Sequence, residues 1–286
     1  MDTYKIFYNT SKDVYYHIAV EKYLLETLEP HTNVLYLWQS SGAVVVGKHQ
    51  NIWKECNYKV CLDNNIKIAR RISGGGAVYQ DLGNLNFSFI SSKESCSLDN
   101  NFAILLNMLH RLGINVKRNK NNNLTVDGKK ILGSSFSIKK NAVLHNASLL
   151  IDTDLSLLHK VLKPSFSTIE SRSVESHHSA VVSCCAVSPG PTVKKIIKRT
   201  VQEFQRVYDT REKMAVNSPE VSPDGIAEYY REITDNSWNF GRNPFWSVFP
   251  NDDGYNDNTT LIKILNDGKI NTDTFYHREL IEEPVT

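Results

Sequence analysis

Cysteine is scarce in this sequence, and the few cysteines follow no metal-binding or disulfide pattern. The five, at positions 56, 61, 96, 184 and 185, are odd in number and show neither CxxC spacing nor a Cys/His cluster. Their number and spacing indicate neither a disulfide framework nor a zinc site. We therefore expect a protein of a reducing compartment that holds no metal through these cysteines.

Long hydrophobic runs and an excess of one charge are also lacking. The longest apolar runs, such as residues 43–46, are far too short to cross a bilayer, and the N-terminus has no apolar signal-peptide core. The 33 basic and 31 acidic residues leave a formal net charge of +2, which gives no electrostatic footprint for nucleic acid or an anionic membrane. We expect a soluble protein that binds neither.

The order of apolar patterns predicts a mixed α and β fold. Strands are expected at residues 5–8, 34–39, 43–47, 66–72, 84–91, 124–126, 129–136 and 142–151, and helices at residues 11–29, 100–112, 154–162 and 192–208. The helices carry apolar residues at helical spacing, and Ser11 is the expected cap of the first. A chain of 286 residues is long enough for one large domain, or for a catalytic domain of roughly 200 residues with an appendage.

Three pairs of segments have the pattern of hairpins. Residues 34–39 and 43–47 flank Ser40-Ser41-Gly42, residues 124–126 and 129–136 flank Asp127-Gly128, and residues 260–265 and 269–276 flank Asn266-Asp267-Gly268. The second pair is the clearest, because Asp-Gly tolerates the positive φ angles of a type I′ turn. The Ser-rich stretch from 163 to 191 is predicted to be a long loop.

The most informative segment for chemistry is RRISGGGAVYQDLGN, residues 70–84. Gly74, Gly75 and Gly76 remove every Cβ from a short turn, so backbone N–H groups can close on an anion or a flat ring. Arg70 and Arg71 add planar, permanently charged donors suited to carboxylate or phosphate. Taken alone, the glycine run is as typical of a plain flexible turn. It lacks the Lys-Ser/Thr of a P-loop and the GxGxxG spacing of a dinucleotide site, so both readings are dropped.

A second segment, NNLTVDGKKILGSS at residues 122–135, places two lysines directly after a hairpin turn. Strand alternation predicts that Lys130 points to the face opposite Lys129 and Ile131, so that one lysine can project into a site while its neighbour stays in water. A solvated lysine is the commoner outcome for any single hairpin lysine. The small residues at 133–135 would leave room for a ligand beside the strand.

Three further groups invite a functional reading that a structural role matches better. His177 and His178 lie without a third metal ligand in the Ser-rich stretch. Cys184 and Cys185 are more often structural cysteines than nucleophiles. Trp238, Phe240, Phe245 and Trp246 could form a partner-binding patch, but an apolar core that joins two domains is the commoner role of such a group.

Together these segments resemble the lipoate–protein ligase and lipoyltransferase family. The family motifs RRxSGGGxVxHDxGN and NDLxVxGKKxxGSA match residues 70–84 and 122–135. Three more motifs occur in the family's order, with GKHQNIWKECN at 47–57, LHNASLL at 144–150 and SWNFG at 237–241. The neighbourhood of Trp53 and Cys56 is also similar to the animal mitochondrial lipoyltransferases, which use preformed lipoyl-AMP.

The resemblance implies an α/β (α+β) fold with a mixed sheet, a biotin ligase or class II synthetase-like catalytic core, and a small accessory domain. We expect the lipoyl-adenylate-binding catalytic domain at residues 1–215, and a connector with a partial accessory domain at residues 216–286. The family's accessory domain normally continues well past the predicted terminal hairpin, so we expect a shortened one here.

The resemblance also implies a site. Lys130 matches the family's functional lysine and is expected to be catalytic, because an ammonium beside a mixed anhydride stabilises charge that develops on its oxygens during amine attack. The expected lipoyl-AMP-binding residues are Arg71, Ser73, Gly74, Gly75, Gly76, Ala77, Val78, Tyr79, Gln80, Asn84, Asn123, Lys130, Gly133, Ser134, His145 and Ser148. Trp38 and Val45 are expected to line a slot for the lipoyl chain, and residues 170–174 to lie near the adenylate.

Several positions depart from the family pattern. Gln80 and Asn146 replace motif histidines, and Asn123 replaces a motif aspartate. A neutral amide at 123 weakens any magnesium site needed for adenylation, because Mg²⁺ favours carboxylate oxygens. We therefore favour lipoyl transfer from lipoyl-AMP over full ligation, with ATP and Mg²⁺ required only if ligase activity is retained. A lipoyl-adenylate-binding relative without turnover, and an amidotransferase with a cysteine thioester, remain alternatives.

The implied partners are the lipoyl domains of 2-oxoacid dehydrogenase complexes and the H protein of glycine cleavage. We expect a monomer with no nucleic-acid or membrane partner. Mitochondrial residence is expected from the resemblance to the animal transferases alone, because residues 1–12 show no legible transit peptide.

Overall fold

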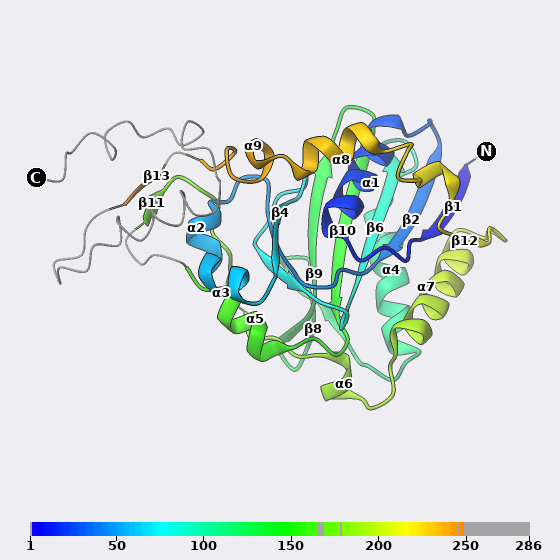
Figure 1. Ribbon diagram of the computed structural model, residues 1–286. Helices are drawn as coiled ribbons and strands as arrows, with labels where there is room; N and C mark the ends of the chain where they lie inside the picture. The colour runs from blue at the N-terminus through cyan, green and yellow to red at the C-terminus, as the bar shows by residue number, and fades with distance from the viewer. Residues whose placement is uncertain (1, 165–168, 178, 245, 249–286) are drawn as a thin grey trace, which may run out of the picture.

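The computed structural model describes residues 2–164, 169–177, 179–244 and 246–248 (Figure 1). Its strands are β1 (Thr3–Tyr8), β2 (Thr32–Trp38), β3 (Ala43–Val46), β4 (Lys67–Arg70), β5 (Val78–Gln80), β6 (Asn84–Ser92), β7 (Lys117–Arg118), β8 (Leu124–Val126), β9 (Lys129–Ile138), β10 (Ala142–Leu150), β11 (Ile169–Ser171), β12 (Met214–Val216) and β13 (Trp246–Val248). Its helices are α1 (Val14–Thr27), α2 (Ile52–Glu55), α3 (Tyr58–Asp63), α4 (Leu98–His110), α5 (Leu155–Val161), α6 (Cys184–Val187), α7 (Val193–Val207), α8 (Ala227–Thr234) and α9 (Asn236–Asn239), with a 3-10 turn at Pro219–Val221. The expected mixed α/β fold is confirmed.

The main sheet has eight strands in the order β12-β1-β2-β6-β10-β9-β8-β7. It is a mixed sheet, because β1 runs parallel to both β12 and β2 while the remaining neighbours are antiparallel. A second sheet has the order β4-β3-β5, and β11 pairs with β13. Figure 1 shows α4 and α7 on one side of the main sheet and α1 with α8 on the other.

Alternation along β2 shows why the main sheet has apolar layers on both faces. Leu35 and Leu37 belong to the cluster that packs against α4 and α7, whereas Val34, Tyr36 and Trp38 belong to the cluster that includes α1 and α8. Successive strand residues point to opposite faces, so a strand covered on both faces buries all of its side chains. A third cluster fills the space between the β3–β5 sheet and α2, α3 and α5.

The predicted hairpin between residues 34–39 and 43–47 is wrong. Both segments are strands, but β2 pairs with β1 and β6, whereas β3 pairs with β4 and β5 in the other sheet. Both edges of β2 and both edges of β3 are therefore occupied by other strands, and the two do not pair with each other. The Ser40-Ser41-Gly42 link carries the chain from one sheet to the next.

The Asp-Gly hairpin is confirmed. β8 and β9 pair antiparallel, with φ of 48° at Asp127 and 78° at Gly128, as a type I′ turn requires. The predicted loop at 163–191 is corrected in part, because its described residues include β11 and α6. The predicted terminal hairpin at 260–276 lies outside the described residues.

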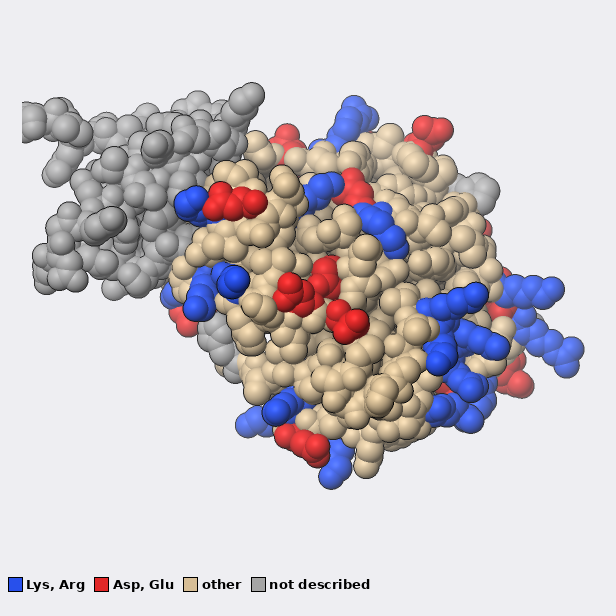
Figure 2. Space-filling view, turned by 60° about the horizontal axis from the view of Figure 1, so that its bottom comes forward, with Lys and Arg blue, Asp and Glu red and all other residues tan. Residues whose placement is uncertain are grey.

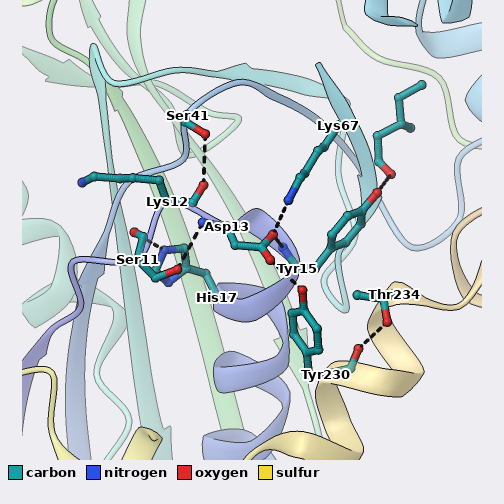
Figure 3. A network of polar contacts seen from close by, with 10 residues as sticks. Ser11, Lys12, Asp13, Tyr15, His17, Ser41, Lys67, Tyr230 and Thr234 are labelled. Carbon is teal, nitrogen blue, oxygen red and sulfur yellow. Dashed lines mark hydrogen bonds and ion pairs between the residues drawn. The ribbon is translucent and has the colours of Figure 1, made fainter. Parts of the chain in front are cut away.

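The first helix begins at Val14, and its cap is Asp13 rather than Ser11. Asp13 Oδ1 accepts from the Tyr15 amide (3.1 Å), while the Ser11 hydroxyl accepts from the Asp13 amide (3.2 Å). The same carboxylate accepts from Lys67 Nζ (2.9 Å) and from the Tyr230 hydroxyl (2.7 Å), as can be followed in Figure 3. A single side chain thus joins α1, β4 and α8.

Surface charge follows the balanced composition. Figure 2 shows basic and acidic side chains both spread over one face, with lysine and arginine most numerous toward its right edge. On α7, the side opposite the buried apolar stripe is exposed and basic, with Lys194, Lys195, Lys198 and Arg199. Among the described residues, no helix combines the length and apolar character that a membrane span requires.

Candidate active site

Two adjoining cavities lie where the small sheet meets β9 and β10. The larger cavity, of about 540 Å³, has an apolar wall from Tyr79, Leu150, Leu158 and Leu162. The smaller cavity, of about 250 Å³, is lined by Ile18, Trp38, Val45, Arg71 and Asn146, among others. The two share Ala77, Val78, Lys130, Gly133, Ser148, Glu175, Ser176, His177 and Ser179. An elongated ligand with two chemically different ends fits this arrangement.

Lys130 stands at the junction of the two cavities. It points away from the exposed Lys129, as strand alternation predicts. Burial, with a smaller contribution from the charge of Arg71, lowers the Lys130 pKa. The end of its side chain folds over Gly133, where any Cβ would overlap it. No carboxylate among the described residues pairs with this ammonium, so its position favours an anionic or polarised ligand.

Arg71 shapes the glycine turn from inside. Its guanidinium donates to the carbonyl oxygens of Val45 (3.0 Å), Gly74 (2.5 Å) and Gly76 (2.8 Å). Burial lowers its pKa to about 10, so it remains positively charged at neutral pH. Because several donors already bind backbone oxygens, Arg71 positions the turn as well as lining the smaller cavity.

Ser73 is buried directly behind the cavity wall. Its hydroxyl accepts from Arg71 Nε (3.1 Å), lies 3.0 Å from Ser135 Oγ and donates to Asn146 Oδ1 (3.0 Å). This network ties the glycine turn to β9 and β10. Gly74 lies in the same turn and, like Ser73, is not among the lining residues.

The segment at residues 172–177, which we call the strap, also borders both cavities, through Glu175, Ser176 and His177. Ser176 Oγ accepts from the Ala77 amide (2.8 Å) and from Gln50 Nε2 (3.0 Å), and it donates to the Glu55 carboxylate. Val174 lines the smaller cavity. The strap contains the end of the 170–174 segment that was expected near the adenylate.

The lining of the smaller cavity includes a buried carboxyl group that the sequence reasoning missed. Glu21 accepts from Ser88 Oγ and Asn146 Nδ2, both at 2.5 Å, and burial raises its pKa to about 7. A signal was present in the sequence, because Glu21 continues the apolar stripe of Val14 and Ile18 at helical spacing. An acidic residue on a buried helix face calls for a specific reason.

Most of the expected ligand-binding residues line the two cavities. They are Arg71, Gly75, Gly76, Ala77, Val78, Tyr79, Gln80, Asn123, Lys130, Gly133, Ser134 and Ser148. Trp38 and Val45 line the smaller cavity, where the lipoyl slot was expected. Their contact with a ligand stays a prediction.

Two expected residues lie elsewhere. The ring of His145 packs among Phe89, Phe102 and Phe136 in the core, and burial lowers its pKa to about 3. The side chain of Asn84 accepts from the Asp81 amide (3.0 Å) and from Thr153 Oγ1 (3.0 Å), so it stabilises a turn. Neither residue lines either of the two cavities. For His145 the reason is strand alternation, which turns its side chain to the opposite face of β10 from Asn146.

The ambiguous groups also have definite places. Cys184 is buried in the core, where burial raises its pKa to about 12, and neither it nor Cys185 lines a cavity. A thioester mechanism needs an accessible thiolate, so this geometry disfavours it. Trp238 is buried in one apolar cluster and Phe240 packs against another, while their expected role in joining two domains stays a prediction. Phe245, His178 and the side chain of Trp246 lie outside the described parts.

The comparisons with known proteins identify the family. The sequence model of the protein family described as the lipoyl protein ligase A/B catalytic domain matches residues 13–205. A lipoate–protein ligase A of Bdellovibrio bacteriovorus is 33% identical over 248 residues, covering 84% of this chain and 73% of the relative.

Two solved structures share the fold. LipL1 of P. falciparum in complex with lipoate has a TM-score of 0.73 at 26% identity, covering 87% of this chain and 76% of that chain. A bipartite lipoate protein ligase of Thermoplasma acidophilum, described with its E2 lipoyl domain, has a TM-score of 0.72 at 20% identity over 85% of this chain and 98% of that chain. The second likeness bears on the fold alone.

Proposed function

Because the chain belongs to the lipoyl protein ligase A/B catalytic-domain family and is an enzyme of that family, we propose that it transfers the lipoyl group of lipoyl-AMP to one specific lysine of a carrier protein. The observation that carries this proposal is the Lys130 ammonium at the junction of the two cavities. Its position matches a ligand whose reactive anhydride lies between two different ends.

The smaller cavity suits the acyl chain and the larger one the nucleotide. Ile18, Trp38 and Val45 offer an apolar wall for the lipoyl chain, while the larger cavity has the volume for AMP. The anhydride then lies beside Lys130 and the Gly75–Gly76 backbone. These donors stabilise the charge that grows on its oxygens in the transition state.

The transfer step exchanges one acyl bond for another. The neutral amine of the acceptor lysine attacks the lipoyl carbonyl carbon, the bond from that carbon to the AMP oxygen breaks, and the amine loses one proton. AMP leaves as an anion beside Lys130. A free lysine has a pKa of about 10.4, so the attacking amine needs positioning and proton removal by the site or the carrier.

We favour transfer from lipoyl-AMP over activation of lipoate with ATP, because few carboxylate oxygens near the cavities are left to bind Mg²⁺. Asn123 brings no carboxylate to the smaller cavity, while Glu55 binds Ser176 and Glu175 binds Lys54. These carboxylates hold the strap, which leaves few oxygens for a hydrated Mg²⁺ ion. The 33% identical relative is named a ligase, so ATP-dependent ligation is the second candidate.

The carriers we propose are lipoyl domains and the glycine-cleavage H protein. This choice of carriers rests on the chain's membership of the lipoyl protein ligase family. Residence in mitochondria is part of the proposal and rests on the resemblance to the animal transferases. Microscopy of the tagged chain in animal cells checks that location.

The deciding experiment incubates the protein with an apo lipoyl domain in two mixtures. One contains lipoate, ATP and Mg²⁺, and the other contains synthetic lipoyl-AMP. Lipoylated carrier in the second mixture alone identifies a transferase, and product in both identifies a ligase. Tight binding of lipoyl-AMP with no product in either mixture would instead identify a binding protein.

A further inference from the structure

Arg70 is fully buried, yet its guanidinium faces no carboxylate among the described residues. It binds oxygen atoms from two segments that are distant in sequence. Nη1 donates to the carbonyl oxygens of Gly47 (3.1 Å) and Gln50 (2.7 Å), while Nε donates to the Asn239 carbonyl (3.0 Å). Nη2 donates to Asn243 Oδ1 (2.7 Å). One side chain thus joins the turn at residues 47–50 to the segment at residues 236–243.

The backbone of Arg70 strengthens the same connection. Its amide donates to Asn239 Oδ1 (2.8 Å), and its carbonyl accepts from Trp238 Nε1 (2.8 Å). Hydrogen bonds to a buried charged donor are among the stronger ones in proteins. The 236–243 segment is therefore fixed to the end of β4, next to the glycine turn.

The turn at residues 47–50 contacts both the glycine turn and the strap. A Cβ on Gly47 would overlap the Gly75 carbonyl oxygen, and the Lys48 amide donates to the Ser73 carbonyl (2.9 Å). On the strap side, the Val174 amide donates to the His49 carbonyl (3.0 Å), and Gln50 Nε2 donates to Ser176 Oγ (3.0 Å). A shift of this turn moves the glycine turn and the strap together.

We infer that Arg70 is a positioning residue, which uses the 236–243 segment as an anchor to fix the glycine turn and the strap around the acyl-adenylate. This role deepens the proposed function and rests on it. It also separates the two motif arginines: Arg71 lines the smaller cavity, whereas Arg70 lines neither of the two cavities and acts through residues 47–50.

Asn243 offers a near-isosteric test of this role. Its Oδ1 accepts from Arg70 Nη2 (2.7 Å) and from the Ile52 amide (3.1 Å), whereas its Nδ2 atom is buried without a partner among the described residues. Asn243→Asp keeps both acceptor contacts, and Asn243→Ala removes them. Asn236→Ala is the matched control, because Asn236 is exposed on the same segment and its side chain makes no hydrogen bond with a described residue.

The first readout is amide hydrogen exchange of the unliganded protein. In Asn243→Ala and Arg70→Lys, we expect exchange at least about tenfold faster at residues 47–50, 73–77 and 172–177, because each variant loses at least one charge-assisted hydrogen bond. Asn243→Asp and Asn236→Ala should match the parent. Faster exchange only near residues 52 and 239–243, or an Asp variant that behaves as the Ala variant does, would overturn the inference.

The second readout is the dissociation rate of a non-hydrolysable lipoyl-adenylate analogue. We expect it to rise about tenfold in Asn243→Ala and to return to the parental rate in Asn243→Asp. Unchanged dissociation in Asn243→Ala contradicts the positioning role. If the parent protein does not bind the analogue but the exchange pattern appears, the proposed function fails while the connection through Arg70 stands.

Discussion

Two neighbouring lysines on β9 separate the chemistry of the site from its general charge. Lys130 reaches the junction of the cavities, whereas Lys129 is exposed on the other face. Their backbone positions differ by one residue, and their environments differ completely. Strand geometry, which alternates side chains between faces, accounts for the difference.

Lys130→Ala is expected to lower the rate of lipoyl transfer from lipoyl-AMP by about a hundredfold or more, because one preorganised charge is lost from the transition state. Lys129→Ala removes the same charge outside the cavities and should leave the rate unchanged. Single-turnover assays with an apo lipoyl domain measure both rates. Equal rates for the two variants would contradict the role of Lys130.

Glu21 is expected to make stability fall as pH rises. Burial raises its pKa from 4.5 to about 7 in the folded protein, so between these values the folded state holds a proton that the unfolded state has lost. One such proton changes the free energy of unfolding by about 1.4 kcal/mol per pH unit. Stability therefore decreases as pH rises through this window.

Urea unfolding at pH 5, 6 and 7 tests this expectation. Relative to the parent, Glu21→Gln should gain stability with rising pH, because glutamine does not titrate. Glu26→Gln, on an exposed position of the same helix, should show no such gain. A parental pH profile in Glu21→Gln would show that the buried carboxyl does not titrate in this range.

At the scale of elements, short polar contacts fix where helices begin and how they meet their neighbours. Asp13 caps α1 and also binds Lys67 of β4 and Tyr230 of α8 (Figure 3). Burial tends to raise the pKa of this carboxyl, but the hydrogen bonds from Tyr230 and Lys67 outweigh it and hold the pKa below its usual value. The ionised form is thus the one that joins the three elements.

Asp13→Ala is expected to lower the free energy of unfolding by about 1–2 kcal/mol, the usual effect of a lost helix cap, with further loss from the two other contacts. Ser11→Ala, at the position expected to be the cap, removes only the hydrogen bond from the Asp13 amide and should lower it by less. Thermal and urea unfolding measure both effects. A larger effect at Ser11 would assign the cap to that residue.

At the scale of the whole molecule, each face of the main sheet buries a neutral imidazole. His17 stacks on Trp38 on one face, and burial lowers its pKa from 6.5 to about 4. His145 lies among phenylalanines on the other face, where burial lowers its pKa to about 3. Below about pH 6.5 these two imidazoles bind protons in the unfolded chain but not in the folded protein, so acid lowers the free energy of unfolding.

His145→Leu is expected to flatten the acid side of the stability profile between pH 6 and 4 by about 1.4 kcal/mol per pH unit, the contribution of one proton. His110→Leu, on the exposed face of α4, should leave the slope unchanged. Urea unfolding across this range measures the slopes. An unaltered slope in His145→Leu would mean that His145 titrates alike in both states.

Local sequence was enough for the parts of this protein that depend on local geometry. The Asp127-Gly128 turn, the amphipathic α7 and the opposite directions of Lys129 and Lys130 all follow from backbone preferences and side-chain periodicity within a few residues. The resemblance through the five motifs pointed to the family that the comparisons show. The division at residue 215 stays a prediction.

Only the tertiary structure decided which distant segments meet. The strands at Thr32–Trp38 and Ala43–Val46 were both foreseen, but their partners depend on edges supplied by β1, β4, β5 and β6. Burial of Glu21, the core position of His145 and the anchoring of Arg70 by residues 239–243 likewise depend on contacts across the chain. Such contacts are set by long-range packing, which composition and periodicity do not encode.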